Sequence, residues 1–357
     1  MLPVLLASLA AAPAAAGCAP DADLDYVCGP EKPEDVLALP GTRWLIASGF
    51  SPGAGLKLVD TVTRTATLWY DGTAAAPDRR HHSDCPAPPD PRLFNTRGLS
   101  LRAIGRDRWR LLVVNHGGRE AIEAFEVRGR GTAAPTLVWR GCLPMPAGQV
   151  ANSVASFADG TVIATVLTRP GTAIADFVRG GITGGVWQRR PGERAFTLLP
   201  GTELPGNNGI EVDPDDRRFH VVAFGWHAVV TFDRADTRTP LARVPAPDFM
   251  PDNIHWTGGR MLLAGMRLDE PACGGLRRIA DGIADPMLCH RGWVVGEFDR
   301  AAGRIATVAY GRPQAGFNGL SAAAITAGGE LWLGSFQSGR LAIVRGWRAT
   351  PSEGAKP

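Results

Sequence analysis

The chain has 357 residues, of which 45% are hydrophobic and 20% are charged, and its formal net charge is +3 at pH 7. This balance is typical of a globular protein with enough apolar material for a core, and it excludes a chain that is disordered throughout. Arginine supplies almost all of the positive charge and is interleaved with Asp and Glu, so we expect no nucleic-acid partner.

The first 17 residues have the composition of a secretory signal. They are apolar, and small residues near 15–17 suit a cleavage site, although the usual positive start is missing. The sequence therefore predicts export, with a periplasmic or secreted product. Ala15-Ala16-Gly17-Cys18 is also a weak lipoprotein box, so a lipid anchor at Cys18 is the alternative to plain export. No later stretch reaches the roughly 18 apolar residues that a membrane span needs, so we expect no transmembrane span.

Six short apolar runs recur along the remaining chain, bounded by Gly, Pro, Asp and Asn. They begin at Trp44, Leu111, Val162, Phe219, Met261 and Leu331. Such runs are typical of strands and turns, and their spacing of roughly 40 to 70 residues fits four-stranded propeller blades stretched by loop insertions. We therefore predict an all-β protein, a six-bladed β-propeller over residues 28–348, with a disordered tail at 349–357. An array of β-sandwiches is the alternative.

Two long segments, 72–93 and 266–292, lack a strand pattern and are predicted to be loops over one face of the propeller. They would set the shape of a binding pocket. The cysteines fall partly within these segments, at positions 18, 28, 85, 142, 273 and 289. An even number suits disulfides in an exported protein, and we favour Cys273 with Cys289 because they bracket one loop. A zinc site at His81, His82 and Cys85, or at Cys289 and His290, is disfavoured because it lacks a second spaced pair.

Acid or amide residues recur about 8 to 12 positions before four of the apolar runs. These residues are Glu34, Asn152, Asn208, Asp252 and Asn253. Any one of them alone would be interpreted as a turn residue. Their repeated phase instead predicts one oxygen-bearing side chain at the start of the innermost strand of several blades, facing the central channel. Because Ca2+ takes six to eight oxygen ligands, the sequence predicts a central calcium site on the propeller axis.

Several motifs, in the same order, resemble the paraoxonase/arylesterase family. This family comprises secreted six-bladed propellers related to the gluconolactonase-like and strictosidine-synthase-like propellers. The matching segments are Pro33-Glu-Asp-Val-Leu-Ala-Leu-Pro-Gly, Phe94-Asn-Thr-Arg-Gly-Leu-Ser, Leu111-Leu-Val-Val-Asn-His, Asn208-Gly-Ile-Glu-Val-Asp-Pro-Asp and Asp252-Asn-Ile. The resemblance runs from about residue 28 to residue 345, and the motifs are specific as a set rather than singly.

The resemblance implies two calcium ions. The catalytic ion would be held by Glu34, Asn152, Asn208, Asp252 and Asn253, leaving positions for water and a substrate oxygen. The second, structural ion would use Asp35, the backbone carbonyl of Leu99, and an Asp that is replaced here by Ser153. Losing that carboxylate weakens the second site.

The proton chemistry departs from the family pattern. The family pairs a His within Phe-Asn-x-His-Gly with the His of Val-Val-Asn-His. Here His116 is present, but Arg97 occupies the first position, and arginine cannot act as a base. Arg97 could instead bind a substrate carboxylate or phosphate, or steady an oxyanion. His116 is then either the base or a packed histidine, Glu34 is another candidate base, and His255 is an outside candidate because it follows the Asp-Asn pair.

The closure of the ring departs as well. The family links a Cys before its Glu-Asp motif to a Cys in the last strand, but here no Cys follows Cys289. We therefore expect Cys28 to pair elsewhere, with Cys18 as one choice, and the ring to close by strand pairing alone.

The function implied by the resemblance is a calcium-dependent hydrolase of small-molecule lactones or aryl esters. One alternative is a propeller that binds a ligand without hydrolysing it, which the replacement by Arg97 favours. The other is a lyase or condensing enzyme on the same scaffold, because a fold does not dictate a reaction.

Overall fold

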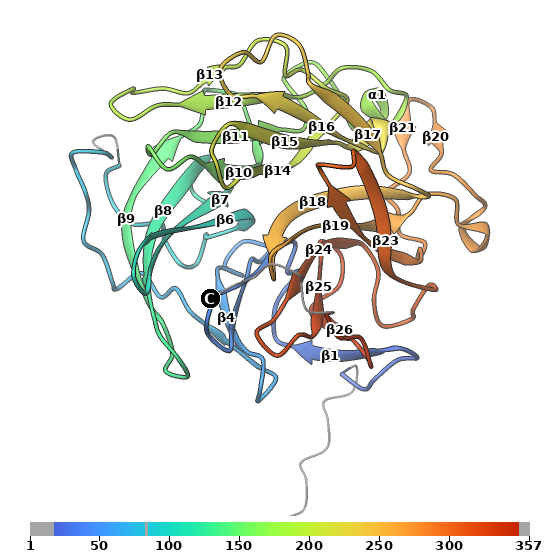
Figure 1. Cartoon of the computed structure of the whole chain (residues 1–357), viewed down its shortest axis with the longest axis horizontal. Helices are drawn as coiled ribbons and strands as arrows, with labels where there is room; N and C mark the ends of the chain where they lie inside the picture. The colour runs from blue at the N-terminus through green and yellow to red at the C-terminus, as the bar shows by residue number, and fades with distance from the viewer. Residues whose placement is uncertain (1–17, 83–84, 350–357) are drawn as a thin grey trace, which may run out of the picture.

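The computed structural model describes residues 18–82 and 85–349. Their strands form six four-stranded antiparallel sheets around a common axis, so the fold is the predicted all-β, six-bladed β-propeller (Figure 1). Helix in these residues is confined to α1 (Ile174–Val178) and two single turns, η1 (Phe224–Trp226) and η2 (Pro271–Cys273). None of it is long and apolar enough to cross a membrane. The expected signal at 1–17 and all but the first residue of the expected tail lie outside the described residues.

Each blade is a meander whose first strand contacts the first strands of the neighbouring blades and therefore lines the axis. Blade 1 comprises β2 (Val36–Ala38), β3 (Trp44–Ala47), β4 (Lys57–Asp60) and β5 (Thr65–Leu68). Blade 2 comprises β6 (Thr96–Gly105), β7 (Arg108–Asn115), β8 (Ala121–Arg128) and β9 (Thr136–Pro144). Blade 3 comprises β10 (Ala151–Ser156), β11 (Val162–Val166), β12 (Gly185–Arg189) and β13 (Thr197–Leu198).

The second half of the chain repeats this order. Blade 4 comprises β14 (Asn207–Val212), β15 (Arg218–Ala223), β16 (Ala228–Asp233) and β17 (Ala242–Pro245). Blade 5 comprises β18 (Phe249–Thr257), β19 (Arg260–Arg267), β22 (Trp293–Asp299) and β23 (Arg304–Gly311). Blade 6 comprises β24 (Leu320–Ile325), β25 (Leu331–Ser335), β26 (Arg340–Val344) and β1 (Leu24–Cys28).

The six apolar runs found in the sequence are the second strands of the six blades, namely β3, β7, β11, β15, β19 and β25. All residues of β11 and of β25 are buried. A second strand has neighbouring blades against both of its faces, so it shows a continuous apolar run instead of an alternation. The core accordingly consists of clusters between adjacent blades, such as Val295 of blade 5 against Leu331 and Leu333 of blade 6.

The N-terminal strand closes the ring. β1 pairs antiparallel with β26, with Leu24 opposite Val344 and Cys28 opposite Arg340. Across this seam Arg345 Nη2 donates to Asp25 Oδ1 at 3.0 Å. Closure by strand pairing was the expectation, and it removes the free sheet edges that an open ring would expose. The strands begin at Leu24, four residues before the expected start of the propeller at residue 28.

Three disulfides join Cys18 to Cys28, Cys85 to Cys142 and Cys273 to Cys289. The predicted pairing of Cys273 with Cys289 is confirmed, as is the choice of Cys18 as the partner of Cys28. A lipid anchor would need the same sulfur atom of Cys18, so the lipoprotein alternative is incompatible with this disulfide.

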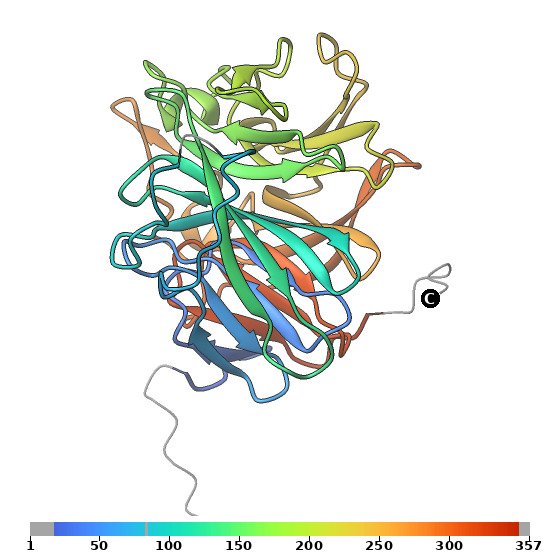
Figure 2. The same ribbon diagram turned by 90° about the vertical axis from the view of Figure 1, so that its left-hand side faces the viewer.

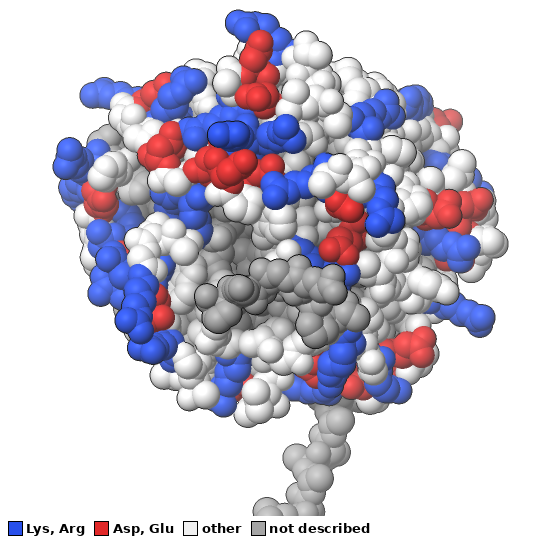
Figure 3. All heavy atoms as spheres, viewed as in Figure 1, with Lys and Arg blue, Asp and Glu red and all other residues white. Residues whose placement is uncertain are grey.

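Both long loops lie on the side of the ring where the inner strands begin. In a meander, the connection between the second and third strands returns to the face from which the first strand starts. The segment between β19 and β22, which carries the short strands β20 (Ile279–Ala280) and β21 (Ile283–Ala284), therefore lies on that face, as does α1. Figure 2 shows the segment between β19 and β22 and helix α1 on the side of the propeller away from the end of β26. On the opposite face, positive and negative side chains are interleaved (Figure 3).

Candidate metal centre

The five predicted calcium ligands lie where inner strands begin. Glu34 lies two residues before β2, Asn152 and Asn208 are the second residues of β10 and β14, and Asp252 and Asn253 lie in β18. Four blades thus contribute to the set. All of these side chains except Asn152 are buried, and Asn152 is half-buried.

A β-bulge interrupts β10, β14 and β18 at the same place. The register with the second strand shifts between Ala151 and Val154, between Asn207 and Ile210, and between Pro251 and Ile254. The residues released from the ladder include four of the five predicted ligands, all except Glu34, and a bulge re-aims side chains in this way. In blade 2 the shift falls between Thr96 and Leu99, which places Arg97 at the same position. Sequence reasoning found the repeated phase but missed the bulges that cause it.

Glycine follows two of these positions because the inner strands approach closely. A Cβ atom on Gly209 would lie 2.7 Å from Cα of Asn253, and one on Gly98 would lie 2.6 Å from Cα of Ser153. Cβ atoms in proteins do not come this close to non-bonded atoms, so any side chain at Gly209 or Gly98 would push neighbouring blades apart near the axis. The glycines of Phe-Asn-x-x-Gly and Asn-Gly thus have a packing reason.

Direct contacts join four of the five ligands. Asn253 Nδ2 donates to Glu34 Oε1 at 3.2 Å, although 219 positions separate the two residues. The side chain of Asn208 is hydrogen-bonded to the Asp252 carboxylate. Ser321 Oγ of blade 6 donates to the Glu34 carbonyl at 2.6 Å and holds the chain in place before β2. Asn152 is the second residue of β10, the inner strand next to β14.

Several oxygens in this set are buried without a hydrogen-bond partner. They are Glu34 Oε2, Asn152 Oδ1, Asn208 Oδ1, Asn253 Oδ1 and, beside them in the chain, Ser153 Oγ. Burying a polar group without a partner costs free energy, typically about 1–3 kcal/mol each. The first four are carboxylate or amide acceptors, and a hard divalent cation would satisfy them together. The residues present therefore fit a calcium ion.

Burial and nearby negative charge disfavour the ionised form of both carboxylates of the set. Burial, and then the neighbouring Asp35 carboxylate, raises the pKa of Glu34 to about 7. Burial, and then the Glu34 carboxylate, raises the pKa of Asp252 well above its usual range. A cation bound between them would remove this repulsion. Among residues 18–82 and 85–349, no three or more His, Cys, Asp and Glu side chains are grouped as a metal site, so the ring differs from a zinc centre in being rich in amides.

Arg97 lies beside this ring of oxygens. Its guanidinium carbon is 3.2 Å from the centre of the Phe50 ring, and its Nη1 donates to the side chain of Asn95. Burial lowers the pKa of Arg97 to about 10, against the opposing effect of the Glu34 and Glu120 carboxylates. The side chain is therefore a fixed positive charge at neutral pH.

His116 follows β7 directly and is oriented by a residue that sequence reasoning missed. Its Nδ1 lies 2.7 Å from Glu120 Oε2, and Glu120 Oε1 accepts from Ala151 N–H at 3.0 Å. The pair therefore adjoins Asn152. The sequence does indicate this pair, because His116 and Glu120 are four positions apart within the short connection between β7 and β8.

Of the set predicted for the second ion, Asp35 and Leu99 do come together. Asp35 Oδ2 accepts from Leu99 N–H at 2.7 Å, and Asp35 Oδ1 faces His255 Nε2 at 2.8 Å. On its other side His255 faces Glu211, which was also missed. Burial would lower the pKa of His255, but the Asp35 and Glu211 carboxylates outweigh burial and raise it to about 10.

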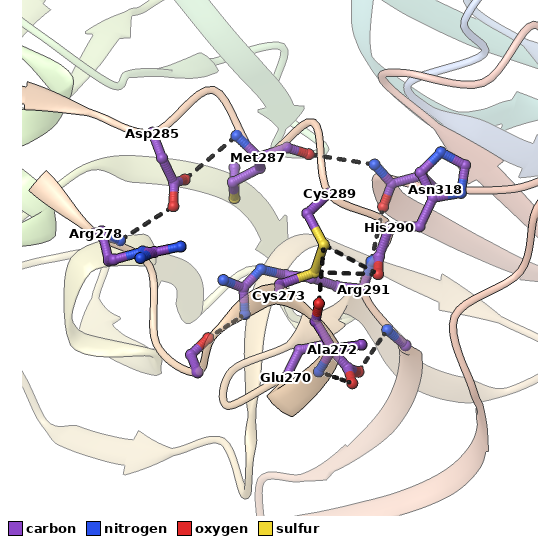
Figure 4. Close-up of a disulfide and its surroundings, with 12 residues drawn as sticks. Glu270, Ala272, Cys273, Arg278, Asp285, Met287, Cys289, His290, Arg291 and Asn318 are labelled. Carbon is purple, nitrogen blue, oxygen red and sulfur yellow. Dashed lines mark hydrogen bonds between the residues drawn. A yellow bond between two sulfur atoms is a disulfide. The ribbon is translucent and has the colours of Figure 1, made fainter.

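An apolar cluster covers the face of the propeller on which the predicted calcium ligands lie. Its members come from loops that connect second and third strands and from the ends of β18 and β19: Phe177, Phe224, Met250 and Met266, with Leu268, Met287 and Phe336 packed against them. The disulfide between Cys273 and Cys289 fastens the longest of these loops, and Asn318 Nδ2 donates to the Met287 carbonyl at 3.2 Å (Figure 4). The loop is thus fixed over the face where the ring lies.

A cavity of about 410 Å³ lies elsewhere, between blades 2 and 3. Arg108, Arg110 and Asp159 line it together with His82, and it contains none of the predicted site residues.

Comparisons with known proteins give the fold. No protein-family profile and no curated protein matches the sequence. A gluconolactonase from Xanthomonas campestris is similar in structure, with 15% identity, a TM-score of 0.50, and coverage of 90% of this chain and 88% of that chain. A luciferin-regenerating enzyme follows at 12% identity and a TM-score of 0.48, covering 90% and 92%. At 15% identity the likeness to the gluconolactonase shows the propeller fold and nothing about activity.

Proposed function

We propose that the protein is a calcium-dependent hydrolase of lactones or aryl esters, of the paraoxonase/arylesterase type. The observation that carries the proposal is the set of buried oxygens without partners, Glu34 Oε2, Asn152 Oδ1, Asn208 Oδ1 and Asn253 Oδ1. Four blades supply them, and each lies at or near the start of an inner strand. With Asp252 they provide two carboxylates and three amides, a donor set that leaves coordination positions for substrate and water.

Bound calcium would polarise the substrate carbonyl and stabilise the negative charge that develops on its oxygen. The protein side chains would hold the ion in place. Contacts from Asn253 to Glu34 and from Asn208 to Asp252 fix both carboxylates before the ion arrives. Fixed ligands cost little reorganisation during the reaction.

His116 is the proposed proton carrier. The Glu120 carboxylate faces Nδ1, so Nε2 is the nitrogen that can take a proton from attacking water and later return it to the leaving oxygen. Arg97 cannot share this task because it stays protonated. Its charge suits an anionic substituent of the substrate, a carboxylate or a phosphate, or the oxyanion itself.

We place this activity outside the cytoplasm, in the periplasm or beyond the cell. Three disulfides support that location, because cytosolic proteins seldom keep disulfides.

The test uses the full chain with its disulfides intact. We expect turnover of phenyl acetate or of a γ- or δ-lactone, loss of that turnover in EGTA, and recovery with added calcium. Asn208→Ala and Asp252→Ala should abolish it without unfolding the protein. Turnover that persists unchanged in EGTA or in both variants would show that calcium is not catalytic.

A second candidate is a propeller that binds calcium and a ligand without hydrolysing it. Arg97 favours this candidate, because it stands where the family has a histidine. Calcium binding with no turnover of any ester or lactone, before and after Arg97→His, would select it.

A further inference from the structure

Asp35 is committed to partners within the protein at both of its carboxylate oxygens. Oδ2 accepts from Leu99 N–H at 2.7 Å, while Oδ1 accepts from Val36 N–H at 2.8 Å and faces His255 Nε2 at 2.8 Å. The side chain is completely buried. One carboxylate that is already saturated, and the neutral hydroxyl of Ser153, form a poor set for a divalent cation. The side chains present therefore do not fit the second calcium that the family resemblance implies.

His255 occupies the side of Asp35 that a cation would need. The imidazole is 4% exposed, and a carboxylate faces each ring nitrogen, Asp35 at 2.8 Å from Nε2 and Glu211 at 3.5 Å from Nδ1. The imidazole therefore contacts a carboxylate on both sides and fills the space next to Asp35. Asp35 precedes the first strand of blade 1, whereas Glu211 and His255 lie in the first strands of blades 4 and 5. The imidazole of His255 thus links blades 1, 4 and 5 at the axis.

We propose that the His255 side chain occupies the position next to Asp35 that a second divalent cation would need, so that the folded propeller binds one divalent cation and not two. The bound ion is the one held by the oxygens of Glu34, Asn152, Asn208, Asp252 and Asn253. The proposal concerns how many ions the axis holds, and it does not depend on ester hydrolysis.

This arrangement makes the joining of the three blades independent of the metal supply. A chelator can remove an ion, but it cannot remove a side chain. We therefore expect the wild-type protein to stay folded in EGTA and to unfold in a single cooperative transition.

The test counts the calcium bound per folded full-length chain, by equilibrium dialysis and elemental analysis, and records thermal unfolding with calcium and with EGTA. It compares the wild type, the double variant Ser153→Asp with His255→Ala, and His220→Gln. His220 is a matched control: it is buried, and its Nε2 lies 3.0 Å from the buried Asp213, but it is in the second strand of blade 4 and not at the axis.

We expect about one calcium per chain in the wild type and in His220→Gln, and about two in the double variant, which regains a carboxylate and an open coordination position. Calcium should also raise the Tm of the double variant by more than it raises that of the wild type. Two ions in the wild type, or no gain in a folded double variant, would overturn the proposal. If the double variant does not fold, the proposal is tested by the wild type alone, from the number of calcium ions that it binds and from whether it stays folded in EGTA. A wild type that binds none would refute the proposed calcium ring, while the gain of one ion in the double variant would still support the role of His255.

Discussion

The raised pKa of Glu34 predicts an unusual dependence of stability on pH in the metal-free protein. In the unfolded chain Glu34 releases its proton near the ordinary value of 4.5, whereas in the folded chain it holds the proton up to about 7. The folded state therefore binds more protons than the unfolded state within this interval. Stability from Glu34 must then fall as pH rises from about 4.5 to about 7, and it stays reduced above 7.

The size of the effect follows from the same two values. The difference between 4.5 and about 7, at about 1.36 kcal/mol per pKa unit, corresponds to about 3 kcal/mol in the free energy of unfolding. Glu34→Gln removes the ionising group and keeps its shape, so the metal-free variant should be more stable than the wild type by up to about 3 kcal/mol above pH 7. The two proteins should converge below pH 4.5.

Calcium reverses the comparison. At 100 times its dissociation constant a ligand stabilises the folded state by about 2.7 kcal/mol, and Glu34→Gln should lose most of this gain because it lacks a carboxylate ligand. The assay is urea denaturation between pH 4.5 and 8, of protein dialysed free of metal and of the same protein with calcium added. Glu297→Gln serves as the control, because that side chain is partly exposed, lies on the third strand of blade 5 and is paired with Arg260 of the second strand. Identical pH slopes for the metal-free wild type and Glu34→Gln would show that the pKa of Glu34 is not raised in the folded protein.

Three further predictions concern the ring and its neighbours. Asn152→Ala should weaken calcium binding at least about tenfold in a titration calorimeter, because an amide oxygen ligand is lost, while far-UV circular dichroism stays unchanged; equal affinity would exclude Asn152 as a ligand. His116→Ala should lower kcat for phenyl acetate by about 10² to 10⁴, and Glu120→Gln should lower it less and move the pH profile, whereas a packed histidine would leave the profile unmoved. Arg97→His should raise turnover of simple lactones if Arg97 replaces a base; no gain, with weaker binding of anionic ligands, identifies Arg97 as an anchor for the ligand.

The fold could be predicted because its signals are local. A second strand such as β11 or β25 is buried on both faces, so it shows as an apolar run in the sequence alone. The oxygen-bearing residues could be found because the blades repeat and place them in the same phase. Both features can be recognised from the sequence without knowing which blades are in contact.

The remaining features depend on contacts between distant parts of the chain. Asn253 meets Glu34, and His255 meets Asp35, across 219 and 220 positions, and no local pattern indicates such pairs. The only local indication of His255 is its position just after the Asp-Asn motif. Its role depends on the blade-4 carboxylate of Glu211 and on the saturation of Asp35, and both follow from how the inner strands approach one another.

The pairing of β1 with β26 has a consequence for folding. It brings the two ends of the propeller together, with Leu24 opposite Val344. Each of blades 1 to 5 is built from one continuous stretch of chain, whereas blade 6 takes its outermost strand, β1, from the opposite end of the propeller. Contacts of such large sequence separation form slowly. We therefore expect the completion of blade 6 to be a late step of folding, and a chain that ends before β26 would leave β1 as an unpaired strand edge.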